Sequence, residues 1–327
     1  MGRMTYAEAS ILALREEMRR DPRVWALGED IGRGGIGGQY KGLQDEFGAQ
    51  RICDTPISES TIMGVGVGAA LAGTRPVIEL RITDFALCST DEIVNQAAKV
   101  RYMLGGQARA PLVVRQPNGM CAGFAAQHSQ STEAWWIHTP GLVVVAPSTP
   151  RDNRALLKAA IRSDDPVIYL EHKEMWGVDG EVPDAEETIE LGKARVAREG
   201  RDLTIVTWSK TASFAEEAAR TLAGEGIEAE VVDLRTLYPW DRDCVIASVE
   251  RTGRLLVAQE SVEIGGFGAE IVADVTQHAF GALKAPPARI GAPRTPVPYS
   301  QPLEEIVRVD APKIAAAARR VAAARRG

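Results

Sequence analysis

Residues 142–170, LVVVAPSTPRDNRALLKAAIRSDDPVIYL, decide the fold class, because they read as a strand, a helix and a second strand. The runs 142–146 and 166–170 are continuously apolar, as expected for strands that are buried on both faces. Between them the sequence predicts a helix over 150–162, with Ser148 or Thr149 as its cap and Pro150 at its first position. This unit predicts a mainly parallel sheet that is covered by helices on both faces.

The same alternation continues on the N-terminal side of this unit. Thr5 and Glu8 form a T-x-x-E capping box, which predicts that the first helix begins there. The other expected strands are 24–27, 76–80 and 111–115, and the other expected helices lie around 60–73, 91–104 and 129–138. All of these belong to one α/β domain.

A second domain is predicted after residues 173–202, a charged stretch that is interrupted by glycine and proline. Beyond it, the apolar runs LTIVTWS, EAEVVDL and RLLVAQE alternate with expected helices at 211–224, 241–251 and 267–280. The expected division is a first domain over 1–185, a linker over 186–202 and a second domain over 203–327. The predicted fold class is therefore α/β, with two domains that each contain a mainly parallel sheet flanked by helices.

Composition excludes several classes of function. The 327 residues have 44 acidic and 38 basic side chains, a net charge of −6, so we expect no nucleic-acid partner. No apolar run approaches the roughly 20 residues of a membrane span, and we expect no membrane partner. The four cysteines show neither paired nor zinc-like spacing. With no signal-peptide pattern at the N-terminus, a cytoplasmic protein is expected.

Two residues are candidates for chemistry. Glu59 lies in residues 54–73, DTPISESTIMGVGVGAALAG, directly before a run of small and apolar residues. It either stabilises a helix N-terminus, or is a buried acid with a raised pKa that exchanges a proton with a ligand nitrogen. His128 follows an expected strand, where parallel α/β enzymes place catalytic groups, but a loop histidine can equally be an ordinary hydrogen-bonding residue. The glycines and alanines after Glu59 indicate a close helix contact.

Ten ordered motifs then identify a family. The chain resembles the β subunits of thiamine-diphosphate-dependent 2-oxo acid dehydrogenases, which include the pyruvate, branched-chain 2-oxo acid and acetoin dehydrogenases. The likeness extends from about residue 4 to about residue 312. The motifs include DTPISES, DFAL, DEIVNQAAKVRYMLGGQ, AAQHSQS, HTPGLVVVAPSTPRD, VVDLRTLYPWD and GGFGAE. The resemblance implies a pyrimidine-binding domain followed by a C-terminal domain of the transketolase kind.

The resemblance also implies roles for residues of the first domain. Thiamine diphosphate reacts through the carbanion at C2 of its thiazolium ring, and its own aminopyrimidine removes the proton. Glu59 matches the glutamate that hydrogen-bonds the pyrimidine nitrogen and so activates this base. Ile57 and Phe85 match residues that pack around the pyrimidine. His128 matches a histidine that faces the substrate and assists the steps with substrate and lipoyl acceptor.

A partner chain is implied by a missing motif. The chain has no GDG sequence, the signature with which this class holds Mg²⁺ and the cofactor diphosphate. The resemblance therefore implies an α subunit that supplies the Mg²⁺ site, in a heterotetramer of two α and two β chains. It also implies docking to an acyltransferase core that bears lipoyl groups.

The resemblance further implies a structural monovalent cation, K⁺, held mainly by backbone carbonyls at Leu112, Ala160, Ile161 and Asp165. Ser163 replaces an acid that is common in the family. An ordinary helix-to-strand turn explains the same sequence equally well.

Two departures from the family affect the substrate. Arg81 stands where relatives have an apolar residue, and Cys88 stands where an amide is common. If Arg81 faces the substrate pocket, it favours a substrate with a second carboxylate or polar group. If it faces the α subunit, it says nothing about the substrate.

The expected function is therefore oxidative decarboxylation of a small 2-oxo acid, or cleavage of acetoin, with transfer of the acyl unit to a lipoyl group. One alternative is a split transketolase that transfers a ketol unit to an aldehyde. Another is a non-catalytic subunit that serves assembly alone, although both Glu59 and His128 are present.

Overall fold

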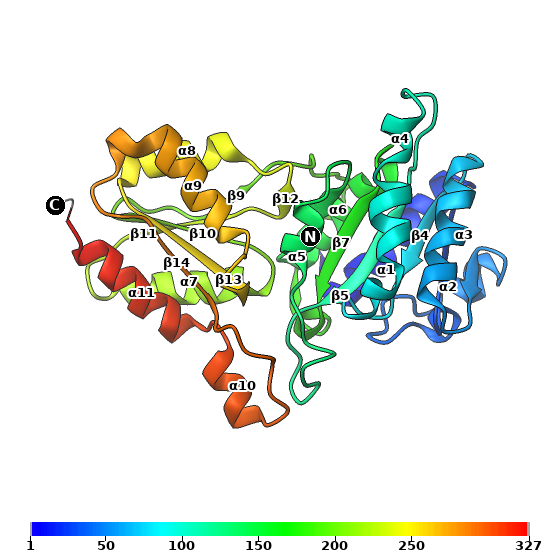
Figure 1. Ribbon diagram of the computed structural model, residues 1–327. Helices are drawn as coiled ribbons and strands as arrows, with labels where there is room; N and C mark the ends of the chain where they lie inside the picture. The colour runs from blue at the N-terminus through cyan, green and yellow to red at the C-terminus, as the bar shows by residue number, and fades with distance from the viewer. Residues whose placement is uncertain (1, 326–327) are drawn as a thin grey trace. The chain divides into compact units, whose positions relative to one another are not determined.

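The computed structural model describes residues 2–325, which form two α/β units (Figure 1). The first unit contains residues 2–121 and 135–191, and the second contains 122–134 and 192–325. Both are built mainly from parallel strands and helices, which confirms the predicted fold class. The division after residue 191 lies inside the expected linker.

The elements of the first unit follow one another in the order predicted for an α/β domain. They are β1 (Gly2–Thr5), α1 (Tyr6–Arg20), β2 (Val24–Gly28), η1 (Ile31–Arg33), α2 (Leu43–Phe47), β3 (Ile52–Asp54), α3 (Glu59–Leu71), β4 (Arg75–Glu79), η2 (Phe85–Ser89), η3 (Glu92–Ala97), α4 (Val100–Met103), β5 (Val113–Asn118), α5 (Glu133–Ile137, which begins in the second unit), β6 (Val143–Val145), α6 (Pro150–Arg162), β7 (Val167–His172), η4 (Lys173–Met175) and β8 (Asp179–Val182).

The main sheet of this unit is parallel, with the order β6-β7-β5-β4-β2-β3, while β1 and β8 form a separate antiparallel pair. Alternate strand residues point to opposite faces. On one face, residues such as Val77 and Tyr169 pack with Leu14 of α1 and Leu156 of α6. On the other, Ile78 of β4 packs against α3. The site described below lies on neither face of this sheet, but at the carboxyl-terminal ends of its strands β2, β3 and β4.

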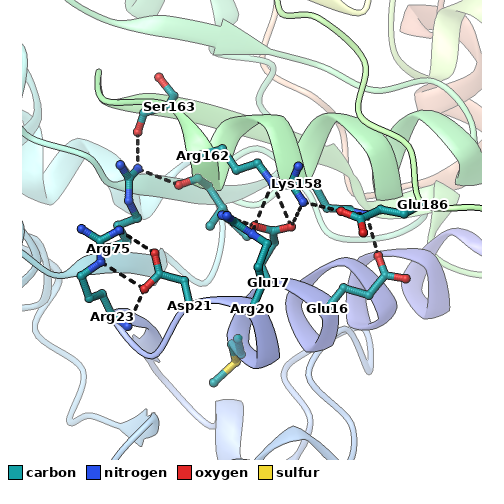
Figure 2. Close-up of polar contacts among 12 residues, drawn as sticks. Glu16, Glu17, Arg20, Asp21, Arg23, Arg75, Lys158, Arg162, Ser163 and Glu186 are labelled. Atoms are coloured by element: carbon teal, nitrogen blue, oxygen red, sulfur yellow. Dashed lines mark hydrogen bonds and ion pairs between the residues drawn. The ribbon is translucent and has the colours of Figure 1, made fainter.

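Helices α1 and α6 are also joined by ion pairs (Figure 2). Lys158 is fully buried, and its Nζ lies 2.8 Å from a carboxylate oxygen of Glu16. Glu17 is fully buried as well and pairs with Arg162 at 2.6 Å and with Arg20 at 2.8 Å. Buried charges are tolerated only when they are paired, so these contacts fix how the two helices pack.

The second unit contains a separate sheet. Its elements are β9 (Arg195–Arg198), β10 (Leu203–Thr207), α7 (Lys210–Ala223), β11 (Ala229–Asp233), β12 (Thr236–Tyr238), α8 (Arg242–Thr252), β13 (Leu255–Val262), α9 (Gly268–Ala279), η5 (Phe280–Ala282), β14 (Ala288–Ala292), α10 (Gln301–Val307) and α11 (Ala311–Ala323).

The sheet of the second unit has the order β14-β13-β10-β11-β9, and only the edge strand β9 is antiparallel. Helices α7 and α11 pack together on one face, and α8 and α9 cover the other (Figure 1). Between residues 2 and 325, no helix has the length and apolar character needed to cross a membrane.

Four sequence expectations differ from the structure. The helix expected over 91–104 is divided into the π-helix η3 and the short helix α4, because Ala98 N donates to Ile93 O, five residues earlier. Of the helix expected over 129–138, only Glu133–Ile137 is helical. The expected linker 186–202 includes β9, which pairs with β11. Residues 122–134, expected within the first domain, group with the second unit.

Candidate functional site

Three neighbouring strands end side by side at the carboxyl-terminal end of the first unit's sheet, which is called the edge below. Strand β2 lies between β3 and β4, and all three run parallel, with Gly28 paired to both Asp54 and Glu79. The segments that follow these strands begin at the same edge, because parallel strands share their direction. This edge therefore brings together Glu29, Glu59 and Arg81, which are distant in sequence.

Glu59 is the first residue of α3 and lies in its first turn. The positive end of the helix dipole favours a carboxylate at this position. Ser58, the N-cap residue, makes no side-chain cap bond, and the Glu59 side chain is half-buried in this chain. The fully buried environment expected for this acid is thus not provided by the described residues alone.

Glu29 is a site residue that the sequence interpretation missed. Its side chain is 7% exposed, and its Oε1 has no hydrogen-bond partner within residues 2–325. Burial raises the pKa of Glu29, the negative charge of Glu59 raises it further, and Arg81 opposes the shift. The raised pKa of Glu29 favours its protonated form, as expected for a buried acid near a second negative charge. The available signal was the position of Glu29 directly after a predicted strand.

Arg81 follows β4 and forms an ion pair with Asp30, the residue after Glu29. The hydrogen bond from Arg81 lowers the pKa of Asp30. Both side chains are partly exposed, at 35% and 51%. The guanidinium therefore lies at the same edge as the two glutamates, with its charge already compensated.

The other predicted residues of this unit surround the start of α3. Phe85 begins η2, which packs against α3, and its side chain is half-buried. Ile57 is 79% exposed, and Cys88 is also exposed. A hydrogen bond between Ser60 and Glu92 joins α3 to η3. An acid, an aromatic ring and an exposed aliphatic side chain thus lie on α3, on η2 and on the segment just before α3.

His128 belongs to the second unit, which contains residues 122–134. Its side chain is exposed, and its backbone N–H donates to Ala125 O at 3.2 Å. Ala125 has a φ of 60°, in the left-handed region that residues with a Cβ rarely adopt. His128 is therefore displayed on a tight turn.

The turn expected to hold K⁺ contains backbone carbonyls that already accept hydrogen bonds. Arg75 Nη1 donates to Ile161 O at 3.0 Å and to Ser163 O at 2.8 Å (Figure 2). Leu112 O accepts from Val167 N. The other two expected ligands are similarly engaged, since Ala160 O and Asp165 O accept from the backbone N–H and the hydroxyl of Ser163. A carbonyl oxygen has two lone pairs, so each can still bind a cation weakly.

Comparisons with known proteins agree with this architecture. The transketolase pyrimidine-binding domain matches residues 2–177, and the transketolase C-terminal domain matches residues 192–314. The acetoin:2,6-dichlorophenolindophenol oxidoreductase subunit beta of Cupriavidus necator is 49% identical, over 94% of each chain. The 2-oxoisovalerate dehydrogenase subunit beta of Bacillus subtilis is 43% identical, over 98% of this chain and 99% of the relative.

A mitochondrial relative and a solved structure extend the comparison. The pyruvate dehydrogenase E1 component subunit beta-1 of Arabidopsis thaliana is 45% identical, over 93% of this chain and 85% of the relative. A solved structure described as a split gene transketolase, inactive beta4 tetramer, has a TM-score of 0.80 and 25% identity, and the match covers 99% of this chain and all of that one.

Proposed function

The chain belongs to the family of E1 β subunits of 2-oxo acid and acetoin dehydrogenases, and from this we propose that it forms half of a thiamine-diphosphate site. With an α subunit, it would catalyse oxidative decarboxylation of a 2-oxo acid, or cleavage of acetoin, and pass the acyl unit to a lipoyl group. The observation that supports this most is the convergence of Glu29, Glu59 and Arg81 at the carboxyl ends of β2, β3 and β4. Ligands of α/β proteins bind at such edges.

When bound, the cofactor supplies a carbanion and an electron sink, which amino-acid side chains lack. In this proposal Glu59 hydrogen-bonds the pyrimidine nitrogen, and Phe85 and Ile57 contact the ring. Glu29, the more buried of the two acids, lies at the same end of the sheet, and its raised pKa favours the protonated form. His128 faces the substrate and the lipoyl acceptor as a hydrogen-bond donor or proton carrier.

The α subunit supplies the Mg²⁺ and diphosphate half of the site. Within residues 2–325, no group of three or more His, Cys, Asp or Glu side chains is arranged to hold a metal ion. Large apolar side chains are exposed on this chain, among them Ile57 at 79% and Tyr102 at 88%. Met103 and Leu104, next to Tyr102, are exposed as well, and neighbouring apolar side chains that are exposed together are typical of surfaces that a partner covers. We propose the two-α, two-β assembly and a lipoyl-bearing acyltransferase partner because the chain belongs to the family of E1 β subunits.

K⁺ at the turn formed by Leu112, Ala160, Ile161 and Asp165 is part of the proposal as a structural ion. The four carbonyl positions fit hard-cation ligands, with one lone pair of each oxygen left. Arg75 already places a positive charge at this turn, so the ion would add only modest stability.

Ketol transfer is the second candidate function, because a split transketolase shares the fold. Its identity is 25%, against 49% and 43% for the acetoin and 2-oxoisovalerate enzyme subunits. Dehydrogenation is therefore the better supported reaction.

Activity of the co-expressed α and β chains tests the proposal. The assay measures dye reduction with pyruvate, branched-chain 2-oxo acids and acetoin, and ketol transfer to an aldehyde in parallel. We expect Glu59→Gln to lower kcat at least about a hundredfold, as loss of a general acid-base group does. Glu270→Gln is the matched control, because Glu270 is an exposed first-turn acid of α9. Full activity of Glu59→Gln, or ketol transfer alone, would contradict the assignment.

A further inference from the structure

We propose that Glu304, Glu260 and Trp208 of the second unit are positioning residues for His128. The inference rests on the proposed role of His128 in catalysis. It gives the C-terminal domain a part in the chemistry, in addition to assembly. The evidence is a set of hydrogen bonds that hold residues 122–134 at both ends, with His128 between them.

Glu304 holds the beginning of this segment. Its side chain, on α10, is 1% exposed, and its Oε2 accepts a hydrogen bond from the backbone N–H of Gly123 at 3.1 Å. The other carboxyl oxygen, Oε1, has no partner within residues 2–325. Burying a carboxyl group is unfavourable unless it is hydrogen-bonded, so the bond from Gly123 offsets part of the desolvation cost of Glu304. The hydrogen bond between Gly123 and Glu304 therefore joins α10 to the segment that contains His128.

Glu260 and Trp208 hold the end of the segment. Ser131 Oγ donates to Glu260 Oε1 at 3.0 Å, and Glu260 lies on β13, an inner strand of the second sheet between β14 and β10. Trp208 Nε1 donates to Glu133 Oε1 at 3.2 Å, and both of these side chains are buried. The Trp208 ring packs on Phe267 with ring centroids 5.8 Å apart. Glu260 and Trp208, which hold this end of the segment, therefore belong to the packed interior of the second unit.

The residues between the two held ends differ in exposure, and Phe124 and Gln130 are exposed as well as the tip at Gln127 and His128. Ser129 is 2% exposed, whereas its neighbours Gln127 and His128 are exposed. The turn at Ala125, with its left-handed backbone, precedes them. Fixing both ends of a short segment restricts the positions that its tip can reach. Because a misplacement of about 1 Å can reduce catalysis about a hundredfold, these distant hydrogen bonds affect the rate.

Three variants of the co-expressed enzyme test the inference. Glu304→Ala removes the acceptor for Gly123, while Glu304→Gln keeps an acceptor oxygen and removes only the charge. Glu305→Ala is the matched control, since Glu305 is the exposed neighbour on the same helix. The measurements are hydrogen exchange of the 122–134 segment and of β13, with kcat and KM for the best substrate.

We expect Glu304→Ala to increase exchange in 122–134 at least about tenfold and to lower kcat at least about tenfold, with KM within about twofold. Exchange in β13 should not change, Glu304→Gln should recover most of the kcat, and Glu305→Ala should match the wild type. Glu260→Ala, with Glu260→Gln as its conservative partner, should show the same changes in exchange of 122–134 and in kcat, with β11 as the reference strand because Glu260 lies on β13.

Unchanged exchange and unchanged kcat in both alanine variants would overturn the inference. A loss of exchange protection throughout the second unit would also overturn it, because it would show a general structural role. The variant His128→Asn separates a failure of the positioning inference from a failure of the proposed function. If His128→Asn keeps full activity while Glu304→Ala still increases exchange in 122–134, the proposed role of His128 is wrong. If it is inactive and the alanine variants behave as wild type, the positioning is wrong.

Discussion

Helix α3 has two kinds of glycine, and they should respond oppositely to substitution. A Cβ on Gly66 would lie 2.2 Å from Ile78 Cδ1, inside van der Waals contact, so Gly66 allows α3 to approach β4. A Cβ on Gly64 or Gly68 would meet no atom within 4 Å, and both residues are exposed. Gly66 thus serves folding, and we expect the other two to serve contact with another chain.

The magnitudes follow from these contacts. Gly66→Ala should lower the free energy of unfolding by about 1 kcal/mol, because overpacking costs about 1–3 kcal/mol and the gain in helix propensity is about 1 kcal/mol. The double variant Gly64→Ala/Gly68→Ala should raise it by about 1–2 kcal/mol in the β chain alone, since helical glycine costs about 0.5–1 kcal/mol relative to alanine.

Larger side chains at Gly64 and Gly68 should weaken the association of the β chain with the α subunit. In the double variant Gly64→Gln/Gly68→Gln, two bulky polar side chains replace hydrogens at a close contact. Overpacking of about 1–3 kcal/mol at each of the two positions then weakens assembly at least about tenfold. Gly281→Gln is the control, because Gly281 is exposed and a Cβ there would also meet no atom within 4 Å. The assays are thermal unfolding of the β chain and mass photometry of α/β mixtures across dilution. Assembly of the glutamine variant within about twofold of wild type, well short of the tenfold loss, would refute a partner contact at these glycines.

Three further predictions concern charge. Burial raises the pKa of Glu79 from 4.5 to about 7, against the effect of Arg115. Between about pH 4.5 and pH 7 the folded chain therefore keeps a proton on Glu79 that the unfolded chain has released, so the free energy of unfolding falls as the pH rises through this range. Glu79→Gln should reduce that fall by up to about 3 kcal/mol in urea unfolding at pH 5 and pH 8, and an unchanged pH profile would contradict it. Because Arg81 already pairs with Asp30, Arg81→Met should leave the ranking of 2-oxo acids and acetoin within about threefold, and an inverted ranking would place Arg81 on the substrate. Replacing NaCl by KCl should raise the melting temperature of the complex by about 1–3 °C through the turn at Ile161, and equal melting temperatures would remove K⁺ from the proposal.

Much of the first unit could be predicted from local sequence. Pro150 and the Thr149 cap define the start of α6, and Thr149 does accept from Asp152 N. The continuous apolar strands on either side are buried as predicted. These features are readable from local sequence, because a cap bonds to residues within one turn and a continuous apolar run is stable only in the protein interior.

The failures come from long-range contacts. Residues 129–132 are not helical, because Ser131 bonds to Glu260, 129 residues away. The break between η3 and α4 depends on a shift from i−4 to i−5 hydrogen bonding, which hydrophobic spacing does not reveal. Glu29 was overlooked for the same reason, since only strand order places it beside Glu59.

The central claim is that this chain provides only half of a cofactor site. Calorimetric titration of thiamine diphosphate with Mg²⁺ into the β chain alone, and into the assembled α/β enzyme, tests it most directly. The account predicts binding to the β chain at least about a hundredfold weaker than to the complex, a difference of about 3 kcal/mol. Equal affinity in the two titrations would contradict it.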